Sequence, residues 1–569
     1  MEAGSVNFIT RVVVATVGAG TGAIGIMRGP SLVGAVAWTV AVAIACYGYG
    51  VVVERLTRAR VSTPFTIVAG LALLLVVSTV LARTDMLGRT TQLVLLAGGL
   101  PAYALPRHED EATRPPWGLV AFSVAAAVLM VVIAIVHEIT PTAGGTNHVF
   151  AIKRLWDTGS FGILRQELGF GLVGESYAAW ATGAQIASVF DLAWCPALLV
   201  GLLAYALPAR DRTVGGIAFV VIAIPIAIYP DITTEWAGTL LACAAFFTLQ
   251  SALETGRTSW HTLLFALALC TSRNEYLVVG SIYAVAALVL PRVSTVSRRA
   301  LVGWCSGWVG ALVGFQLIVK LPVALALIKA LELLLVVPVV AFVIYLLGVA
   351  WRSALAVHWF ATLTFGFGLV LGAVRETQHA PDATVAMWVA LAICSLTIIT
   401  HAPSPRVFSG AAAFVLAIVM SARAFDPAFN GERWGIGMRY AKALLWIQEQ
   451  IALGCMTWVH EDVRAMQEQV PAGEKLLFWG RSAALLDFAR NQIRDVSWLD
   501  AKRWRPTDFL ARLTPARLQG ASYLIVEELE PSTPLLDMWT TSYVPTTASV
   551  QGRLVELGRA GLVRVYKIE

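Results

Sequence analysis

The chain has 569 residues, of which 57% are apolar and only 14% are charged. This is more apolar surface than a soluble globular protein can bury, so the composition excludes that class and predicts a polytopic membrane protein. The formal net charge of +6 lies mostly in short loops between apolar runs, which indicates membrane topology and argues against a nucleic-acid partner.

Apolar runs follow one another along most of the chain. Since roughly 20 residues cross the hydrocarbon layer as a helix, they predict an all-α membrane unit of about fifteen spans. The expected spans are 8–27, 31–53, 65–82, 90–106, 117–137, 191–208, 214–229, 237–253, 259–271, 275–290, 300–318, 323–350, 354–374, 384–400 and 406–423. The short span 259–271 has a re-entrant hairpin as its alternative.

Basic residues assign the two sides of these spans. Turns such as ERLTRAR (54–60) and PRVSTVSRR (291–299) fall on one side, which the positive-inside rule places in the cytoplasm. The long polar stretch 138–190 and the chain after residue 424 fall on the other side. Both are therefore expected outside the cell.

Residues 425–569 are more polar and predict a small extracytoplasmic α/β domain. Strands are expected in 474–480, 492–499 and 521–528, helices in 482–491 and 508–520, and a closing hairpin with a glycine turn in 552–569. Helix and strand thus alternate over most of this part of the chain.

The outer stretch 138–190 predicts two interfacial helices, near 147–156 and 177–190. The first has helical apolar spacing with charges elsewhere, which suits a helix lying flat on lipid, and Gly159 follows as its C-cap. Aromatic residues near span ends, among them Trp180, Trp194 and Trp236, are expected to anchor the chain at the membrane interface.

Several ionisable residues stand at the outer ends of spans. Glu138, beside His137, could act as a general base if partial burial raises its pKa, or could simply end its helix. Asp231 and Glu235 are four residues apart and could share a helix face that binds a cation or a hydroxyl proton, or could stabilise the start of the next helix. Arg273 suits a phosphate, with pairing to Glu275 as its alternative.

Three segments together resemble the GT-C superfamily of integral-membrane glycosyltransferases that use polyprenyl-phosphate sugars. HEITPTAGGTNHVFAIKRLWDTGSFG resembles the family's acidic outer loop, YPDITTEWAGTLLACAAFFTL is similar to its later outer acid and following helix, and LCTSRNEYLVV looks like its Arg-containing entry into a further span. The tail segments VPAGEKLLFWG and ASYLIVEE resemble the outer domains of bacterial members. Two features depart from the family pattern: about four extra spans precede the loop, and His137-Glu138 replaces the usual Asp-Glu or Asp-x-Asp.

The resemblance implies a GT-C-like membrane domain over 117–424, with additional N-terminal membrane helices over 1–116 and the α/β domain over 425–569. It implies that Glu138 is the base and that Asp231 or Glu235 is a second acidic contact. The alternative is that Asp231 or Glu235 is the true base. A possible Mg²⁺ or Mn²⁺ would bind to Glu138 and Asp231. Expected substrate-binding residues are His137, Asn147, His148, Arg273 and Glu275, although Asn147 could instead cap the flat helix.

The activity implied is inverting transfer of a sugar from a polyprenyl-phosphate donor to a lipid-linked, glycan or protein acceptor. It would take place at the outer face of the bacterial cytoplasmic membrane, in cell-envelope polysaccharide biosynthesis. Three alternatives stay open. One is a transporter or flippase of lipid-linked glycans, which would carry charges at mid-membrane; another is a polysaccharide polymerase or ligase that depends on His148 and Arg165; the third is a noncatalytic scaffold.

Overall fold

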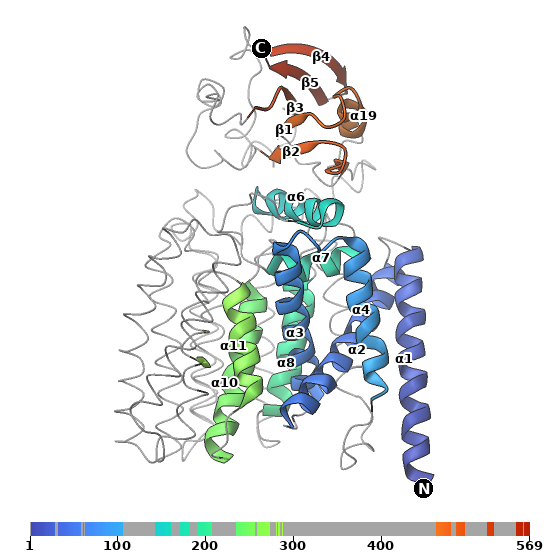
Figure 1. Ribbon diagram of the computed structural model, residues 1–569, viewed down its shortest axis with the longest axis vertical. Coiled ribbons are helices and arrows are strands. Elements are labelled where there is room, and N and C mark those ends of the chain that lie inside the picture. Colours follow the sequence, from blue (N-terminus) through green and yellow to red (C-terminus); the bar gives the residue numbers. More distant parts are fainter. Residues whose placement is uncertain are drawn as a thin grey trace, which may run out of the picture.

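The computed structural model describes residues 2–28, 32–58, 61, 63–105, 143–160, 171–182, 190–206, 235–255, 259–272, 280, 283–284, 287, 462–479, 485–495, 520–527, 554–561 and 563–568. Figure 1 shows these residues as a layer of long helices, a crosswise helix at one end of that layer, and a small sheet domain beyond the crosswise helix.

Four helices open the chain and run up and down beside one another: α1 (Glu2–Arg28), α2 (Leu32–Thr57), α3 (Thr63–Arg83) and α4 (Arg89–Tyr103). Their bounds match the expected helices at 8–27, 31–53, 65–82 and 90–106 within a few residues at most ends. Three more follow: α8 (Cys195–Ala206), α10 (Glu235–Thr255) and α11 (Trp260–Ser272). They coincide with the expected helices at 191–208, 237–253 and 259–271.

Within the described ranges, two helical stretches are long and apolar enough to cross a membrane: Val33–Thr57 and Pro64–Arg83. Val12–Met27, Trp236–Leu249 and Trp260–Cys270 are apolar but shorter. Most residues of the other expected spans lie outside the described ranges. The fifteen-span architecture therefore stays a prediction.

Glycine allows the first helices to approach closely. A Cβ on Gly70 of α3 would overlap the carbonyl oxygen of Cys46 on α2, and a Cβ on Gly48 of α2 would overlap the carbonyl oxygen of Gly99 on α4. Backbones this close bring many atoms into van der Waals contact, which is how helices associate where lipid removes the hydrophobic drive.

The outer stretch forms α6 (Ala143–Thr158), α7 (Gly171–Thr182) and a single π-helical turn, η3 (Phe190–Trp194), that runs into α8. The first predicted helix is confirmed, and so is its C-cap. Gly159 has φ of 74°, a left-handed conformation that glycine adopts without strain, and its N–H donates to the Leu155 carbonyl at 2.8 Å. The second helix lies earlier than the predicted 177–190.

The C-terminal part folds as a five-stranded sheet of order β2-β1-β3-β5-β4. Its strands are β1 (Lys475–Trp479), β2 (Gln492–Asp495), β3 (Tyr523–Glu527), β4 (Leu554–Ala560) and β5 (Val563–Ile568), and α19 (Asp462–Glu468) precedes them. β2, β1 and β3 are parallel, whereas β5 is antiparallel to both β3 and β4. All three predicted strands and the closing hairpin are confirmed, with Gly561 at φ 53° in its turn.

The helix predicted for 482–491 is wrong over its described part, because residues 486 and 487 have no regular structure and residues 488–490 form a turn. One oxygen of Asp487 accepts hydrogen bonds from the N–H groups of Ala489 (2.9 Å) and Arg490 (3.1 Å). A short acidic side chain that bonds the backbone two and three residues on competes with helix formation.

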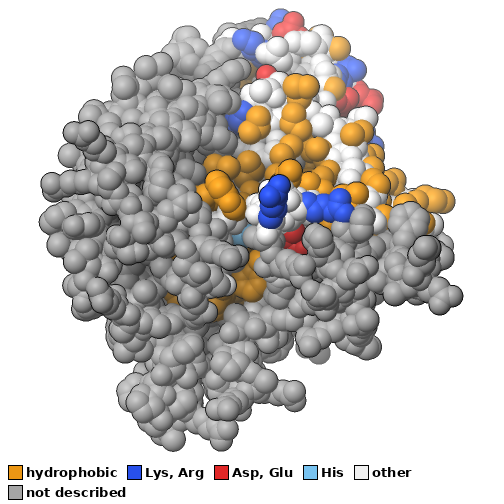
Figure 2. All heavy atoms as spheres, turned by 60° about the horizontal axis from the view of Figure 1, so that its bottom comes forward, with side chains coloured by type: hydrophobic (Ala, Val, Ile, Leu, Met, Phe, Trp, Pro, Cys, Tyr) orange, Lys and Arg blue, Asp and Glu red, His pale blue; other side chains and the backbone are white. Residues whose placement is uncertain are grey.

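The two ends of the helical layer differ in character. Arg55 lies in the last turn of α2 and Arg58 follows it, at the end of the layer opposite α6 and the sheet domain. Figure 2 brings this end forward and shows Lys and Arg side chains there, with hydrophobic side chains over the neighbouring flank. The predicted placement of ERLTRAR (54–60) opposite the outer stretch agrees with this arrangement.

Candidate functional site

Most of the predicted site residues lie outside the described part of the chain: His137, Glu138, Asp231, Arg273 and Glu275. The other three lie in helices whose backbone is described there. Glu235 is the first residue of α10, and Asn147 and His148 lie in the first half of α6.

Asn147 does not cap α6, because the helix begins four residues earlier, at Ala143. Gly144 and Gly145, which precede Asn147 in the chain, therefore belong to the first turn of the helix. Only an N-cap side chain reaches the unpaired N–H groups of the first turn, so the capping alternative for Asn147 is wrong.

The apolar face of α6 packs on protein and not on lipid. Ala151, Ile152 and Leu155 are all fully buried. Leu155 belongs to the core of the helical layer, whereas Ile152 belongs to the core of the sheet domain together with Phe478 and Val565. The predicted amphipathic helix is therefore present, but these apolar side chains contact other parts of the chain where contact with lipid was expected.

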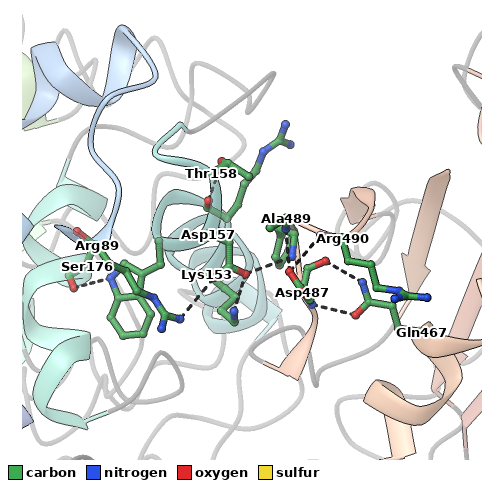
Figure 3. A network of polar contacts seen from close by, with 12 residues as sticks. Arg89, Lys153, Asp157, Thr158, Ser176, Gln467, Asp487, Ala489 and Arg490 are labelled. Atoms are coloured by element: carbon green, nitrogen blue, oxygen red, sulfur yellow. Dashed lines mark hydrogen bonds and ion pairs between the residues drawn. The ribbon is translucent and has the colours of Figure 1, made fainter. Parts of the chain in front are cut away.

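Asp157 links three parts of the chain (Figure 3). Its carboxylate accepts from Lys153 Nζ of the same helix at 2.5 Å, from Arg89 Nη2 at the start of α4 at 3.4 Å, and from the backbone N–H of Phe488 in the sheet domain at 3.2 Å. A carboxylate has lone pairs enough for all three donors. The end of α6 is thereby tied both to the helical layer and to the sheet domain.

Tryptophans fill the space beneath α6. The Trp180 ring lies 5.8 Å from the Trp38 ring and 5.6 Å from the Trp156 ring, and its indole N–H donates to Gln92 Oε1 at 3.0 Å. The Arg89 guanidinium stands 4.9 Å from the Trp156 ring centroid, within cation–π range.

Two of the predicted interface anchors, Trp194 and Trp236, prove to be packing residues, whereas Trp180 is partly exposed. Trp194 and Trp236 are 2% and 4% exposed, so protein surrounds them. The indole N–H of Trp194 donates to Thr39 Oγ1 of α2 at 3.1 Å. An anchor at a lipid surface would need one wet edge, which these rings lack.

Asp191, which directly follows the outer stretch 138–190, is a buried carboxylate with two described hydrogen bonds. It lies in η3, is fully buried, and accepts two hydrogen bonds from the start of α10: Trp236 N–H to Oδ2 at 3.2 Å and Ala237 N–H to Oδ1 at 2.8 Å. A helix start exposes unpaired N–H groups and a partial positive charge, so a carboxylate is the best cap. Asp191 therefore joins the segment that follows the outer stretch directly to the start of α10, where Glu235 lies.

Glu175 of α7 is a second fully buried acid in the same region. The helix that carries it packs directly on η3, because a Cβ on the neighbouring Gly174 would overlap the Phe190 ring. Neither acid was predicted as a site residue. The signal was present, because an ionisable residue within an apolar stretch, as in SVFDLAW and GLVGESYAAW, is rarely placed there without a role.

Burial shifts the pKa values of two side chains in the outer helices, Tyr177 and Arg154. It raises the pKa of the Tyr177 phenol, so this hydroxyl stays protonated in its 2.8 Å hydrogen bond with Ser78 Oγ of α3. Burial lowers the pKa of the Arg154 guanidinium, and the nearby Asp85 carboxylate opposes that shift. The hydrogen bond between Tyr177 and Ser78 joins α7 to α3.

The described residues contain no group of three or more His, Cys, Asp or Glu side chains that could hold a metal ion. The suggested ligands Glu138 and Asp231 lie outside them. Comparison with known proteins returned no matching family model, no matching curated protein and no matching solved structure.

Proposed function

We propose that this protein is a membrane glycosyltransferase that moves a sugar from a polyprenyl-phosphate donor to a lipid-linked or glycan acceptor. The proposal is supported by one observation: the described parts of the long polar stretch form α6 and α7, whose buried side chains pack into both the core of the helical layer and the core of the sheet domain. A transferase needs such a fixed, water-shielded layer where a lipid-borne donor meets its acceptor.

The chemistry is a single displacement at the anomeric carbon. The acceptor hydroxyl oxygen forms the new bond to that carbon, the bond from the carbon to the phosphate oxygen breaks, and the hydroxyl proton passes to the Glu138 carboxylate. Arg273 stabilises the charge on the departing polyprenyl phosphate, which leaves with the electron pair. Asp231 or Glu235 provides the second acidic contact. No step in this scheme is assigned to a cation.

The test is transfer of radiolabelled sugar from a panel of polyprenyl-phosphate donors, with the purified protein reconstituted in cell-envelope lipids. Glu138→Gln is expected to lower the turnover at least ~100-fold, as loss of a general base does. Asp231→Asn is expected to lower it as well, and the larger of the two losses identifies the base.

Glu54→Gln is the matched control. Glu54 is a buried carboxylate that accepts from Thr66 Oγ1 at 2.6 Å, and it stands near the end of α2 that lies away from α6. Its replacement should leave turnover unchanged. If the wild type transfers no sugar from any donor yet binds lipid-linked glycan, the transferase proposal fails and a transporter replaces it.

A further inference from the structure

We propose that Asp191 is a positioning residue for the second acid of the reaction, an inference that rests on the proposed function. Its carboxylate caps α10 from 45 residues away in the sequence, through the N–H groups of Trp236 and Ala237. Glu235 is the residue immediately before Trp236, and Asp231 lies four residues before Glu235. The cap therefore holds the backbone at the place where the second acid is expected.

The support for this cap is itself fixed. η3 is anchored to α2 through the Trp194 indole and Thr39, and the Phe190 and Trp194 rings pack edge to face with their centroids 6.1 Å apart. A π-helical turn is a rare local distortion that recurs at functional sites. Here it places Asp191 on a segment that runs directly into α8 and is hydrogen-bonded to α2.

Asp191 is not the base of the reaction. It is fully buried, and each of its two oxygens already accepts a backbone hydrogen bond. Taking a proton from the acceptor would remove the negative charge that stabilises the helix start. Asp191 must therefore act through the residues it holds, and an error of about 1 Å in their position is enough to lower turnover by ~100-fold.

The experiment is a double-mutant cycle of Asp191→Ala with Glu235→Gln and, separately, with Asp231→Asn, measured as kcat and KM in the reconstituted transfer assay. Asp191→Ala alone is expected to lower kcat by about 10- to 100-fold with little change in the donor KM. In a protein that already carries the substitution of the acid positioned by Asp191, adding Asp191→Ala should lower kcat by less than about 3-fold. The reason is that the acid whose position depends on Asp191 is already lost.

Asp191→Asn keeps an oxygen acceptor for one of the two N–H groups and should recover part of the activity. Asp487→Ala is the matched control, since Asp487 also caps two backbone N–H groups but does so on the exposed surface of the sheet domain. It should not change kcat. Hydrogen exchange of the Trp236 and Ala237 amides should accelerate in Asp191→Ala and not in Glu235→Gln.

The outcomes of this experiment distinguish failure of the positioning role of Asp191 from failure of the proposed glycosyltransferase function. If the wild type is active and the effects of Asp191→Ala multiply fully with those of both acids, Asp191 has only a structural role and the inference is overturned. The same holds if Asp191→Asn is no better than Asp191→Ala. If the wild type transfers no sugar, the proposed function fails, and the inference fails with it for that separate reason.

Discussion

Asp157 shows how one side chain can join parts of the chain that are far apart in sequence. Its carboxylate is 10% exposed and accepts hydrogen bonds from α4, from α6 and from the sheet domain. Exposed ion pairs contribute little because water screens them, whereas a hydrogen bond to a charged acceptor in a nearly dry junction contributes more. The bond to the Phe488 amide therefore matters more than the pair with Arg89, which is half exposed.

Replacing Asp157 with Ala should weaken the contact between α6 and the sheet domain by about 1–3 kcal/mol, since the Phe488 amide loses a charged acceptor. Faster hydrogen exchange at Phe488 and a lower thermal unfolding temperature would report this loss. Glu556→Ala is the control, because the exposed pair of Glu556 with Arg564 should contribute less than about 1 kcal/mol. Equal effects of the two variants would contradict the assigned role of Asp157.

At the scale of elements, the first helices are held together by backbone proximity. Gly70 of α3 faces the Cys46 carbonyl so closely that no side chain fits between them. Gly20 of α1, in contrast, has no heavy atom within 4 Å of the position its Cβ would take. The two glycines thus differ in packing although both lie inside apolar helices.

We expect Gly70→Ala to destabilise the helical layer by about 1–3 kcal/mol, because the added methyl group forces α2 and α3 apart. Gly20→Ala should be neutral or stabilising by up to about 1 kcal/mol, since alanine favours a helix and meets no neighbour. Thermal unfolding of both variants in lipid nanodiscs compares them directly. A Gly70→Ala variant as stable as the wild type would show that α2 and α3 do not pack this closely.

At the scale of the whole molecule, the four N-terminal helices gain a role that the sequence did not suggest. The turn between α3 and α4 holds α6, through the Leu87 N–H that donates to the Gly159 carbonyl at 3.0 Å and through Arg89 beside Trp156. The extra helices are a platform for the outer layer. An isolated helix of 16 residues is only marginally stable in water, so these tertiary contacts help to hold α6 in place.

The same arrangement predicts sidedness. Arg55→Cys and Ala489→Cys place single thiols at exposed sites on opposite ends of the molecule. A membrane-impermeant maleimide applied to intact cells should label Ala489→Cys at once and Arg55→Cys only after the membrane is opened. The described native cysteines (Cys46, Cys195, Cys243 and Cys270) are buried and should react slowly. Labelling of both sites from one side would contradict the topology.

Local patterns were predicted well from sequence. The strand at Lys475–Trp479, the closing hairpin and the end of α6 at Gly159 were all found, because periodicity and glycine turns act over a few residues. The helix expected around Asp487 was not found, since two backbone hydrogen bonds to the Asp487 carboxylate stabilise a turn there. For the site, the sequence named Glu235 but overlooked Asp191, which the structure places against the residues next to it.

The sequence by itself determined the apolar helices, the strands of the C-terminal domain and the amphipathic character of α6, since each depends on the spacing of neighbouring residues. Only the tertiary structure decided that α6 buries its apolar face between two protein layers instead of on lipid. It alone paired Asp191 with the start of α10. An apolar face or a carboxylate specifies what kind of partner it needs, but segments distant in sequence decide which partner it meets.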